Sequence, residues 1–430
     1  MLTLAALLLT ACGAGKKEKI QVVVLGFDGA NWPTIDPLIA EGKLPFIQKL
    51  KQECAWADFQ TDVPTKSAVV WTSIATGKTM LKHGILDFAF VQANNIQVPY
   101  SNAEKREPSL WQMLDRFNMR SVVINWFVTY PPDSFNGVMV SDRFRQILNK
   151  KPEAANEMID TVHPSMDFYR LKQVVRRDYR EIIERIDLPD FPEMFQELHP
   201  DSNFRKSFTL GNSRAFVKQD ALVEDVTDLL FKTKEADLYM TYFRLPDVVQ
   251  HFVLGLIPDE QLEGVFYEGR DWSISEEKRR EVTGRIAKVM EPVYRYMDRL
   301  LAKYMSDPRF RDAYFLVMSD HGFSLYGGGY NHYNLPDGIG PPPGILLVKG
   351  PGVRPGKIDA SIYDIAPTVL HLFGLPLDRA MDGKPLRDIF KLSRKAKYTT
   401  YRLDREKKSI ARSESDRETL EELKALGYIN

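Results

Sequence analysis

The sequence predicts an α/β fold, in which helices cover both faces of a mainly parallel sheet and which carries a helical insertion. Apolar, largely β-branched runs typical of strands buried on both faces occur at residues 20–27, 121–126, 237–243, 313–319 and 344–348. Helical patterns separate these runs, at residues 32–52, 67–76, 109–117 and 282–305. Because consecutive parallel strands need a crossover connection, the alternation of strands and helices favours a parallel sheet.

Residues 149–232 differ from this pattern. They are rich in charged and aromatic residues, with helical stretches at 168–186 and 214–231 and no convincing buried strand. We interpret them as a helical insertion over the sheet, acting either as a cap that faces the substrate or as a packing lobe. The predicted organisation is a lipoprotein signal and tether (1–18), a first part of the α/β core (19–148), the insertion (149–232), a second part of the core (233–395) and a charged C-terminal segment with a short helix (396–430).

Composition limits the classes of partner. The chain has 430 residues, 58 basic and 58 acidic side chains and a formal net charge of zero. This balance argues against electrostatic binding of a nucleic-acid polymer. The sequence does not indicate an oligomeric state. Cys54 is the one thiol besides Cys12 and is expected to be a small buried residue.

The first twelve residues indicate export. An apolar run too short to span a bilayer ends in Leu9-Thr10-Ala11-Cys12, which resembles the lipobox of bacterial lipoproteins. The resemblance implies that Cys12 is lipidated and tethers the protein to a membrane of the bacterial cell envelope, on its periplasmic or extracellular side. No Lys or Arg precedes the apolar run, which departs from the usual pattern. A plain secretory signal is the alternative.

Six acidic and histidine side chains lie in four short segments at or just beyond predicted strand ends or in glycine-rich turns. They are Asp28, Asp247, His251, Asp320, His321 and His332. Ligands of parallel sheets collect at the carboxyl ends of strands, and carboxylate and imidazole groups are common metal ligands. A single zinc ion normally takes three or four protein ligands, and this set has six. Two ions, each with about three protein ligands and an open position, therefore account for the set better.

A hydroxyl nucleophile is available in the segment TDVPTKSAVVWTSIATGK. The candidates are Thr65, Ser67, Thr72 and Ser73. A helix starting after Pro64 favours Thr65 or Ser67, because the amides at a helix N-terminus stabilise negative charge. The residues alone do not choose between these two.

With these residues in place, the chain resembles the alkaline phosphatase superfamily, and within it the type I phosphodiesterase and nucleotide pyrophosphatase branch. The segments that carry the resemblance lie in order across residues 20–390 and include VVVLGFDGANW, PTKSAVVWTSIATGK, RLPDVVQHF, VMSDHGF and GGGYNHYNLPDGI. The resemblance implies an alkaline phosphatase-like fold and two divalent ions, usually zinc.

The resemblance also implies residue roles. One ion would be held by Asp28, Asp320, His321 and the nucleophile oxygen, and the other by Asp247, His251 and His332. The nucleophile would be Ser67, which stands third in Thr65-Lys66-Ser67. Attack by Ser67 would give a phosphoserine intermediate, which water then hydrolyses.

Two departures from the family narrow the expected substrate. Val69 and Val70 stand where relatives often have Pro and where nucleotide pyrophosphatases have an Asn that holds a phosphoryl oxygen. This argues against nucleotide pyrophosphatase specificity and leaves Trp71 and the amide of Ala68 to shape the pocket. The Pro and Arg of the sulfatase formylglycine motif are also absent, which argues against sulfatase activity.

The predicted function is hydrolysis of small-molecule or lipid phosphoric esters, most simply by a phosphodiesterase. The alternatives are a phosphomonoesterase, a phosphotransferase acting on an envelope lipid or glycan, and a non-catalytic envelope binding protein. The remaining prominent side chains are read mainly as structural. His83 is expected in a turn and His371 in the core, His163 and His199 in solvent, while four residues after a strand either line the substrate cleft or pack in a loop: Asn125, Trp126, Thr129 and Tyr130.

Overall fold

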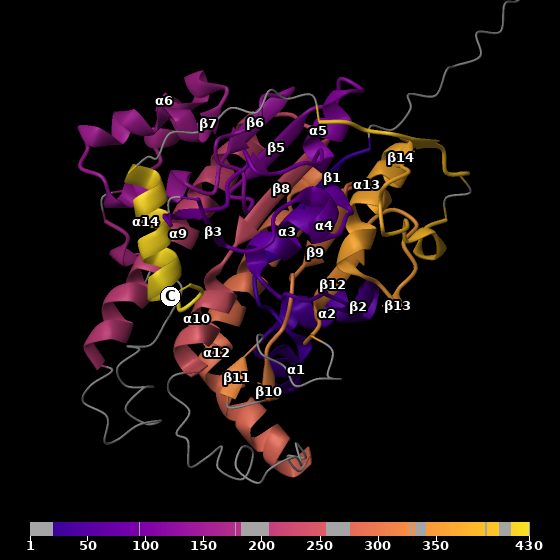
Figure 1. Cartoon of the computed structure of the whole chain (residues 1–430). Coiled ribbons are helices and arrows are strands. Elements are labelled where there is room, and N and C mark those ends of the chain that lie inside the picture. Colours follow the sequence, from indigo (N-terminus) through magenta and orange to yellow (C-terminus); the bar gives the residue numbers. More distant parts are fainter. Residues whose placement is uncertain are drawn as a thin grey trace, which may run out of the picture.

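The computed structural model describes residues 20–93, 95–176, 178–181, 206–254, 276–326, 329–331, 341–391, 394–403 and 414–429. The predicted leader and tether, His199 and His332 lie outside these described residues. Figure 1 shows the arrangement of helices around a central sheet.

The described residues form a nine-stranded sheet in the order β13-β2-β12-β9-β1-β8-β5-β6-β7. The strands are β1 (Val22–Phe27), β2 (Ala55–Phe59), β5 (Ser121–Ile124), β6 (Gly137–Val140), β7 (Val162–His163), β8 (Leu238–Phe243), β9 (Tyr314–Met318), β12 (Gly344–Lys349) and β13 (Gly356–Lys357). The central block β9-β1-β8-β5-β6 is parallel throughout. Strand β12 is antiparallel to both of its neighbours, and β7 is antiparallel to β6. The prediction of a mainly parallel sheet is therefore confirmed.

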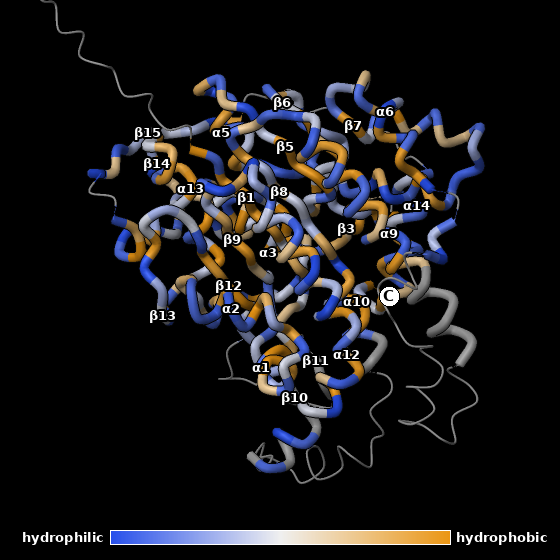
Figure 2. Tube along the Cα trace, turned by 180° about the vertical axis from the view of Figure 1, so that it is seen from behind, coloured by the Kyte–Doolittle hydropathy of each residue, from blue (hydrophilic) through white to orange (hydrophobic). Residues whose placement is uncertain are grey.

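Both faces of the sheet are covered, as β1 shows residue by residue. Val23, Leu25 and Phe27 enter one hydrophobic cluster, whereas Val22 and Val24 enter a second one. Because successive side chains of a strand point to opposite faces, the two clusters are the two sides of the sheet. Figure 2 shows hydrophobic residues gathered along these central strands.

The helices divide between the two clusters. The first face carries α1 (Trp32–Ala40), α2 (Pro45–Glu53), α9 (Lys206–Thr233), α10 (Leu245–Leu254) and α12 (Glu276–Met305). The second carries α3 (Ser67–Thr76), α5 (Leu110–Asp115) and α13 (Ile365–Phe373). The chain also has short helices α4 (Met80–His83) and α6 (Phe168–Lys172) and a C-terminal helix α14 (Glu414–Ala425).

Smaller elements complete the chain. The short strands pair as β3 (Ala89–Val91) with β4 (Gln97–Pro99), β10 (Ser324–Tyr326) with β11 (Gly329–Asn331), and β14 (Leu377–Asp378) with β15 (Tyr398–Thr399). The 3-10 helices are η1 (Phe144–Asn149), η2 (Ala154–Thr161), η3 (Ser165–Asp167), η4 (Pro308–Phe310), η5 (Ile362–Asp364) and η6 (Arg387–Ile389).

The structure has two helices where the sequence predicted one. The pattern over residues 32–52 breaks between α1 and α2, where Gly42 has a φ of 72°. That left-handed conformation ends α1, and Pro45 then begins α2 at a position where its missing N–H costs nothing. The apolar spacing continues across the break because both helices bury their faces against the same cluster.

Four strands of the sheet were not predicted: β2, β6, β7 and β13. Strand β2 alternates buried and half-buried residues, so it lacks the continuous apolar run used as the signal. Strand β7 lies within the predicted insertion and adds two residues to the sheet edge. The domain boundaries themselves stay a prediction. Across the described ranges, no helix combines the length and apolar character that crossing a membrane would need.

Candidate metal centre and nucleophile

Three neighbouring strands bring the predicted ligands to one edge of the sheet. Asp28 directly follows β1, and its backbone N–H donates to the carbonyl of Phe243 at the end of β8 at 2.9 Å. Asp320 comes two residues after β9, which pairs with β1 on the other side. Asp247 lies in the first turn of α10, immediately after β8. Since these strands are parallel, their carboxyl ends meet at the same edge.

Asp28, Asp320 and His321 form the centre of the cluster. Nε2 of His321 lies 3.5 Å from Oδ1 of Asp28 and 3.4 Å from Oδ2 of Asp320. One ligand atom from each residue lies within 4.8 Å of the other two, and all three side chains are buried. This spacing suits donors that share one ion.

Asp247 and His251 form a second pair beside the first cluster. Four residues apart on α10, they face the same side of the helix, and His251 Nε2 lies 3.4 Å from Asp247 Oδ1. His321 links the two groups, because its Nε2 is also 3.9 Å from Asp247 Oδ1. Five of the predicted ligands thus lie together, while His332 lies outside the described residues.

Ser67 stands at the start of α3, facing this cluster. Its Oγ lies 3.4 Å from Oδ1 of Asp28, and the side chain is fully buried. The other hydroxyls of the helix have different partners: Thr72 donates to the carbonyl of Ala68 at 2.7 Å, and Ser73 lies 3.0 Å from Nε2 of His83. Among the hydroxyls of α3, Ser67 is therefore the one directed at the carboxylates.

The electrostatics of the cluster favour a cation. Burial and the charge of Asp28 raise the pKa of Asp320 well above its ordinary value, and burial and the charge of Asp247 raise the pKa of Asp28. Burial lowers the pKa of His321. For Asp247, burial acts to raise the pKa, but the charge and hydrogen bond of His251 bring it below the ordinary value. Like charges this close cost free energy unless a positive charge offsets them.

The donor set itself fits a metal ion. Among the described residues, Oδ2 of Asp320 is fully buried and accepts no hydrogen bond. Buried carboxylate oxygens normally have donors, and metal coordination is one way of satisfying them. Aspartate oxygens and imidazole nitrogens are ligands that suit zinc.

Outer contacts orient the carboxylates. The Tyr242 hydroxyl donates to Oδ2 of Asp28, the Gly29 N–H donates to Oδ1 of Asp320 at 3.3 Å, and the Tyr428 hydroxyl donates to Oδ2 of Asp247. Such contacts fix the direction of metal ligands. The sequence reasoning missed both tyrosines. Tyr242 could have been placed from the sequence, since it shares one face of β8 with Leu238 and Met240. Nothing in the local sequence connects Tyr428 with Asp247.

Two of the four residues named after β5, Asn125 and Trp126, pack in the interior. Asn125 donates to the carbonyl of Tyr242 at 3.0 Å, and Trp126 donates to the carbonyl of Trp71 at 3.1 Å. Both are buried. Trp71, which was expected to shape the substrate pocket, is fully buried against Trp126 and Tyr242, with ring centroids 4.9 and 5.0 Å apart. A Cβ added at Gly26 of β1 would lie 2.6 Å from its ring, so Trp71 packs directly against that strand.

Of the remaining histidines, His371 is buried in the core, as predicted. His83, which was expected in a turn, is the last residue of α4 and is buried. Burial and then Lys105 lower the pKa of His83 to about 3, so the ring is neutral. Its Nδ1 accepts the N–H of Ile85 at 3.2 Å. His163 lies half-buried in β7, with Nε2 3.2 Å from the carbonyl of Phe135, where the sequence suggested a solvated side chain.

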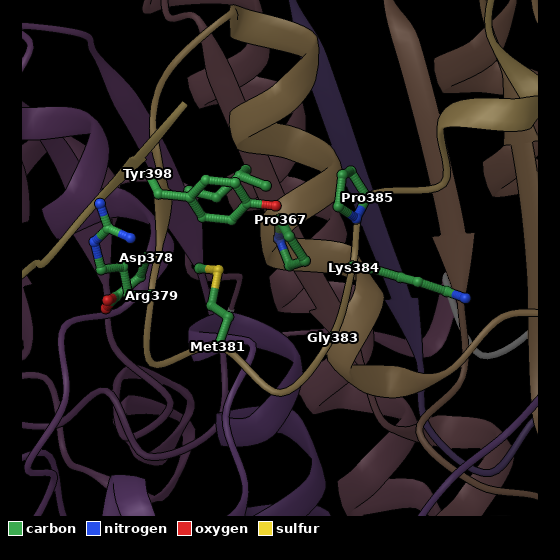
Figure 3. Close-up of a pocket in the computed structure, with 9 residues that line it drawn as sticks. Pro367, Asp378, Arg379, Met381, Gly383, Lys384, Pro385 and Tyr398 are labelled. Carbon is green, nitrogen blue, oxygen red and sulfur yellow. The ribbon is translucent and has the colours of Figure 1, made fainter. Parts of the chain in front are cut away.

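A pocket of about 300 Å³ lies elsewhere, between α13 and the β14–β15 pair. Figure 3 shows Met381 directed towards the ring of Tyr398 and Lys384 extending away from the other lining residues. None of the predicted ligands, nor Ser67, lines it. The pocket is thus separate from the candidate centre.

A comparison with known protein families finds one match. The family model for type I phosphodiesterase / nucleotide pyrophosphatase matches residues 22–337. No curated protein sequence matches the chain significantly.

Solved structures with similar folds include three enzymes. Murine ectonucleotide pyrophosphatase / phosphodiesterase 5 has 11% identity and a TM-score of 0.47, covering 86% of this chain and 99% of its own. A phosphonate monoester hydrolase from Silicibacter pomeroyi has 14% identity and a TM-score of 0.45, covering 86% of this chain and 76% of its own. A 2-O GAG sulfatase has 13% identity and a TM-score of 0.48, covering 86% and 73%. At these identities the similarities say nothing about the substrate.

Proposed function

This chain belongs to the type I phosphodiesterase / nucleotide pyrophosphatase family and is a phosphodiesterase-type hydrolase of phosphoric esters, and on that premise we propose that it acts through a phosphoserine at a two-metal site. The observation that carries the proposal is the position of Ser67. Its Oγ lies 3.4 Å from Oδ1 of Asp28, at the edge of the carboxylate–histidine cluster.

The cluster supports two ion positions. Asp28, Asp320 and His321 would hold one ion together with the Ser67 oxygen, and Asp247 and His251 would hold the other with His332 as the further predicted ligand. We propose zinc for both, because the donors are aspartate oxygens and imidazole nitrogens. When bound, such ions favour the ionised hydroxyl nucleophile and offset the charge that develops on the phosphoryl oxygens.

The chain's own residues would carry the covalent steps. Ser67 Oγ attacks phosphorus, so the Oγ–phosphorus bond forms as the bond from phosphorus to the leaving alcohol breaks, and the alcohol departs with a proton. Water then cleaves the Oγ–phosphorus bond and returns Ser67 to its hydroxyl form. The N-terminus of α3 lies directly beside this centre and favours the negative charge of the phosphoryl group.

Metal analysis and a phosphoester panel test the proposal on the intact protein and on Ser67→Ala. The wild type is expected to contain two ions per chain and to hydrolyse bis-p-nitrophenyl phosphate faster than p-nitrophenyl phosphate. Ser67→Ala should lose activity by about 10³-fold or more while it stays folded. Ser73→Ala is the matched control, because Ser73 is a buried serine of the same helix that contacts His83 instead.

Full hydrolysis by Ser67→Ala would exclude this nucleophile. A wild-type protein that turns over monoesters but no diester would exclude the diesterase assignment. Transfer of the phosphoryl group to an added alcohol in preference to water would replace hydrolysis with phosphotransfer.

We also propose that the enzyme works in the bacterial cell envelope, held by a lipid on Cys12. The lipobox-like residues Leu9 to Cys12 support this location. The substrate is then a small-molecule or lipid phosphoester accessible from outside the cytoplasm.

A further inference from the structure

Two buried arginines lie beside the candidate centre with one carboxylate between them. Oε1 of Glu422, on α14, forms an ion pair with Nη1 of Arg244. The same oxygen lies 3.3 Å from Nη2 of Arg145. Arg145 is 8% exposed and Arg244 is 3% exposed. We call Arg145 and Arg244 the arginine pair.

The arginine pair belongs to the same sheet edge as the metal ligands. Arg244 immediately follows β8 and precedes Asp247 by three residues. Arg145 lies in η1, and its Nη1 donates to Oδ1 of Asn125 at 3.4 Å. Nδ2 of Asn125 in turn donates to the carbonyl of Tyr242 at 3.0 Å. Since the Tyr242 hydroxyl donates to Asp28, a short chain of contacts joins the arginine pair to the centre.

The two buried guanidinium groups, which both contact Glu422, keep N–H donors that no acceptor in the described part of the chain uses. The two like charges are close, because both guanidinium groups contact Oε1 of Glu422, and burial and then the charge of Arg145 lower the pKa of Arg244. Among the described residues, Nε of both arginines is buried and has no hydrogen-bond acceptor. The site therefore has unused donors for a further anionic oxygen.

The other nearby carboxylates are committed to the backbone. Asp220 accepts the N–H groups of Arg244 and Leu245, at 3.2 and 2.9 Å. Asp142 accepts the N–H of Val128 at 3.0 Å and that of Tyr130, also at 3.0 Å. Glu422, by contrast, comes from the last described helix of the chain and keeps 14% of its side chain exposed. Both arginines are therefore fixed in the core, and Glu422 is the group that an incoming anion would displace.

Helix α14 connects this carboxylate to the catalytic centre. The helix lies beside α9 (Figures 1 and 2) and ends at Ala425, and Gly427 follows it with a φ of 74°. The N–H of Tyr428 then bonds the carbonyl of Leu423 at 2.9 Å, and that of Gly427 bonds the carbonyl of Lys424 at 3.0 Å. This Schellman ending turns Tyr428 towards Asp247.

We propose that the arginine pair is a subsite for an anionic group of the substrate, a carboxylate or a phosphate several bonds from the scissile ester, and that Glu422 occupies it when no such group is bound. This inference rests on the proposed function and adds a substrate class to it. An anionic substrate displaces Glu422 from the guanidinium groups, and a neutral one leaves it in place.

Matched substrates and matched variants test the subsite. The substrates are two p-nitrophenyl phosphodiesters, one whose second alcohol carries a remote carboxylate and one in which that carboxylate is a methyl ester. Glu422→Gln removes the competing charge, and Glu421→Gln is the control, because Glu421 is a neighbouring, 63% exposed residue of the same helix. Glu422→Gln is expected to raise the ratio of kcat/KM for the acid over the methyl ester by about tenfold, mainly through KM. Glu421→Gln should leave the ratio at the wild-type value.

A binding measurement keeps the test independent of turnover. Glutarate, compared with the neutral glutaramide, should raise the melting temperature of Glu422→Gln more than that of the wild type or of Glu421→Gln. Arg244→Gln in the Glu422→Gln background should remove this selective shift, and Arg145→Gln serves where that variant does not fold.

The outcomes separate the two proposals. An unchanged substrate ratio and equal glutarate shifts in all variants overturn the subsite, even if diesters are hydrolysed. A selective glutarate shift in a protein that hydrolyses neither diester supports the subsite and overturns the proposed function.

Discussion

Gly29, the residue after Asp28, permits a close approach of its backbone to Asp247, one of the predicted metal ligands. Its φ is 69°, and a Cβ added there would lie 2.8 Å from Cα of Asp247 and 2.9 Å from its Cβ. Substitution by alanine therefore imposes two costs, a left-handed backbone conformation and a collision with the first turn of α10. We expect Gly29→Ala to lower both stability and activity.

The magnitude follows from a comparison with Gly42. Gly42 has nearly the same φ, 72°, but has no atom within 4 Å of an added Cβ. Gly42→Ala should cost about 1 kcal/mol, because a left-handed alanine costs roughly 1–2 kcal/mol and reduced freedom of the unfolded chain returns part of it. Overpacking adds about 1–3 kcal/mol at Gly29, for a total of about 2–4 kcal/mol.

Activity should separate the two variants further. Ordinary van der Waals contact begins near 3.4 Å, so Asp247 Cα must move by about 0.6 Å from its 2.8 Å approach. Misplacement of a catalytic group by 1 Å can cost about 10²-fold, so a loss of about tenfold in kcat/KM is expected for Gly29→Ala and none for Gly42→Ala.

Urea titration of both variants, with kcat/KM on bis-p-nitrophenyl phosphate, provides the measurement. Equal losses of unfolding free energy in the two variants, together with full activity of Gly29→Ala, would show that the first turn of α10 yields without cost. The assignment of Gly29 as a spacer for Asp247 would then be refuted.

Three further predictions each concern a single residue. Folding lowers the pKa of His83 from its ordinary value of 6.5 to about 3, so the unfolded chain takes up a proton first on acidification. Stability should therefore be full above pH 6.5 and decline towards pH 3, and His83→Gln should flatten that slope in urea titrations at stepped pH. Tyr428→Phe removes the hydrogen bond to Asp247 and should weaken metal affinity by about 10- to 100-fold in chelator competition. Tyr398→Phe, at a 53% exposed position, should leave metal affinity unchanged. Unchanged metal affinity in both variants would count against a role of Tyr428 in orienting Asp247. Cys12→Ala should move the protein from the detergent phase to the aqueous phase and abolish the mass of an attached lipid, and a wild-type protein found without lipid would contradict the lipobox prediction.

The sequence by itself indicated the sheet and the edge where the ligands gather. Buried parallel strands need long apolar runs, and Asp28 and Asp320 follow two such runs directly or within two residues. Asp247 and His251 are four residues apart, so any helix places them on one side. For Ser67, physical reasoning left Thr65 as an equal candidate, and the family resemblance made the choice.

The tertiary structure decided what depends on contacts between distant segments. It placed Ser67 beside Asp28, and it brought Tyr428 and Glu422 to Asp247 and the arginine pair across more than 170 residues of sequence. Hydrophobic periodicity reports the neighbours of a residue along its own helix or strand, and it carries no information on which remote side chain meets it. Local pattern and family resemblance were therefore enough to predict the cluster of candidate ligands, while the groups that orient and neutralise their surroundings emerged only from the folded chain.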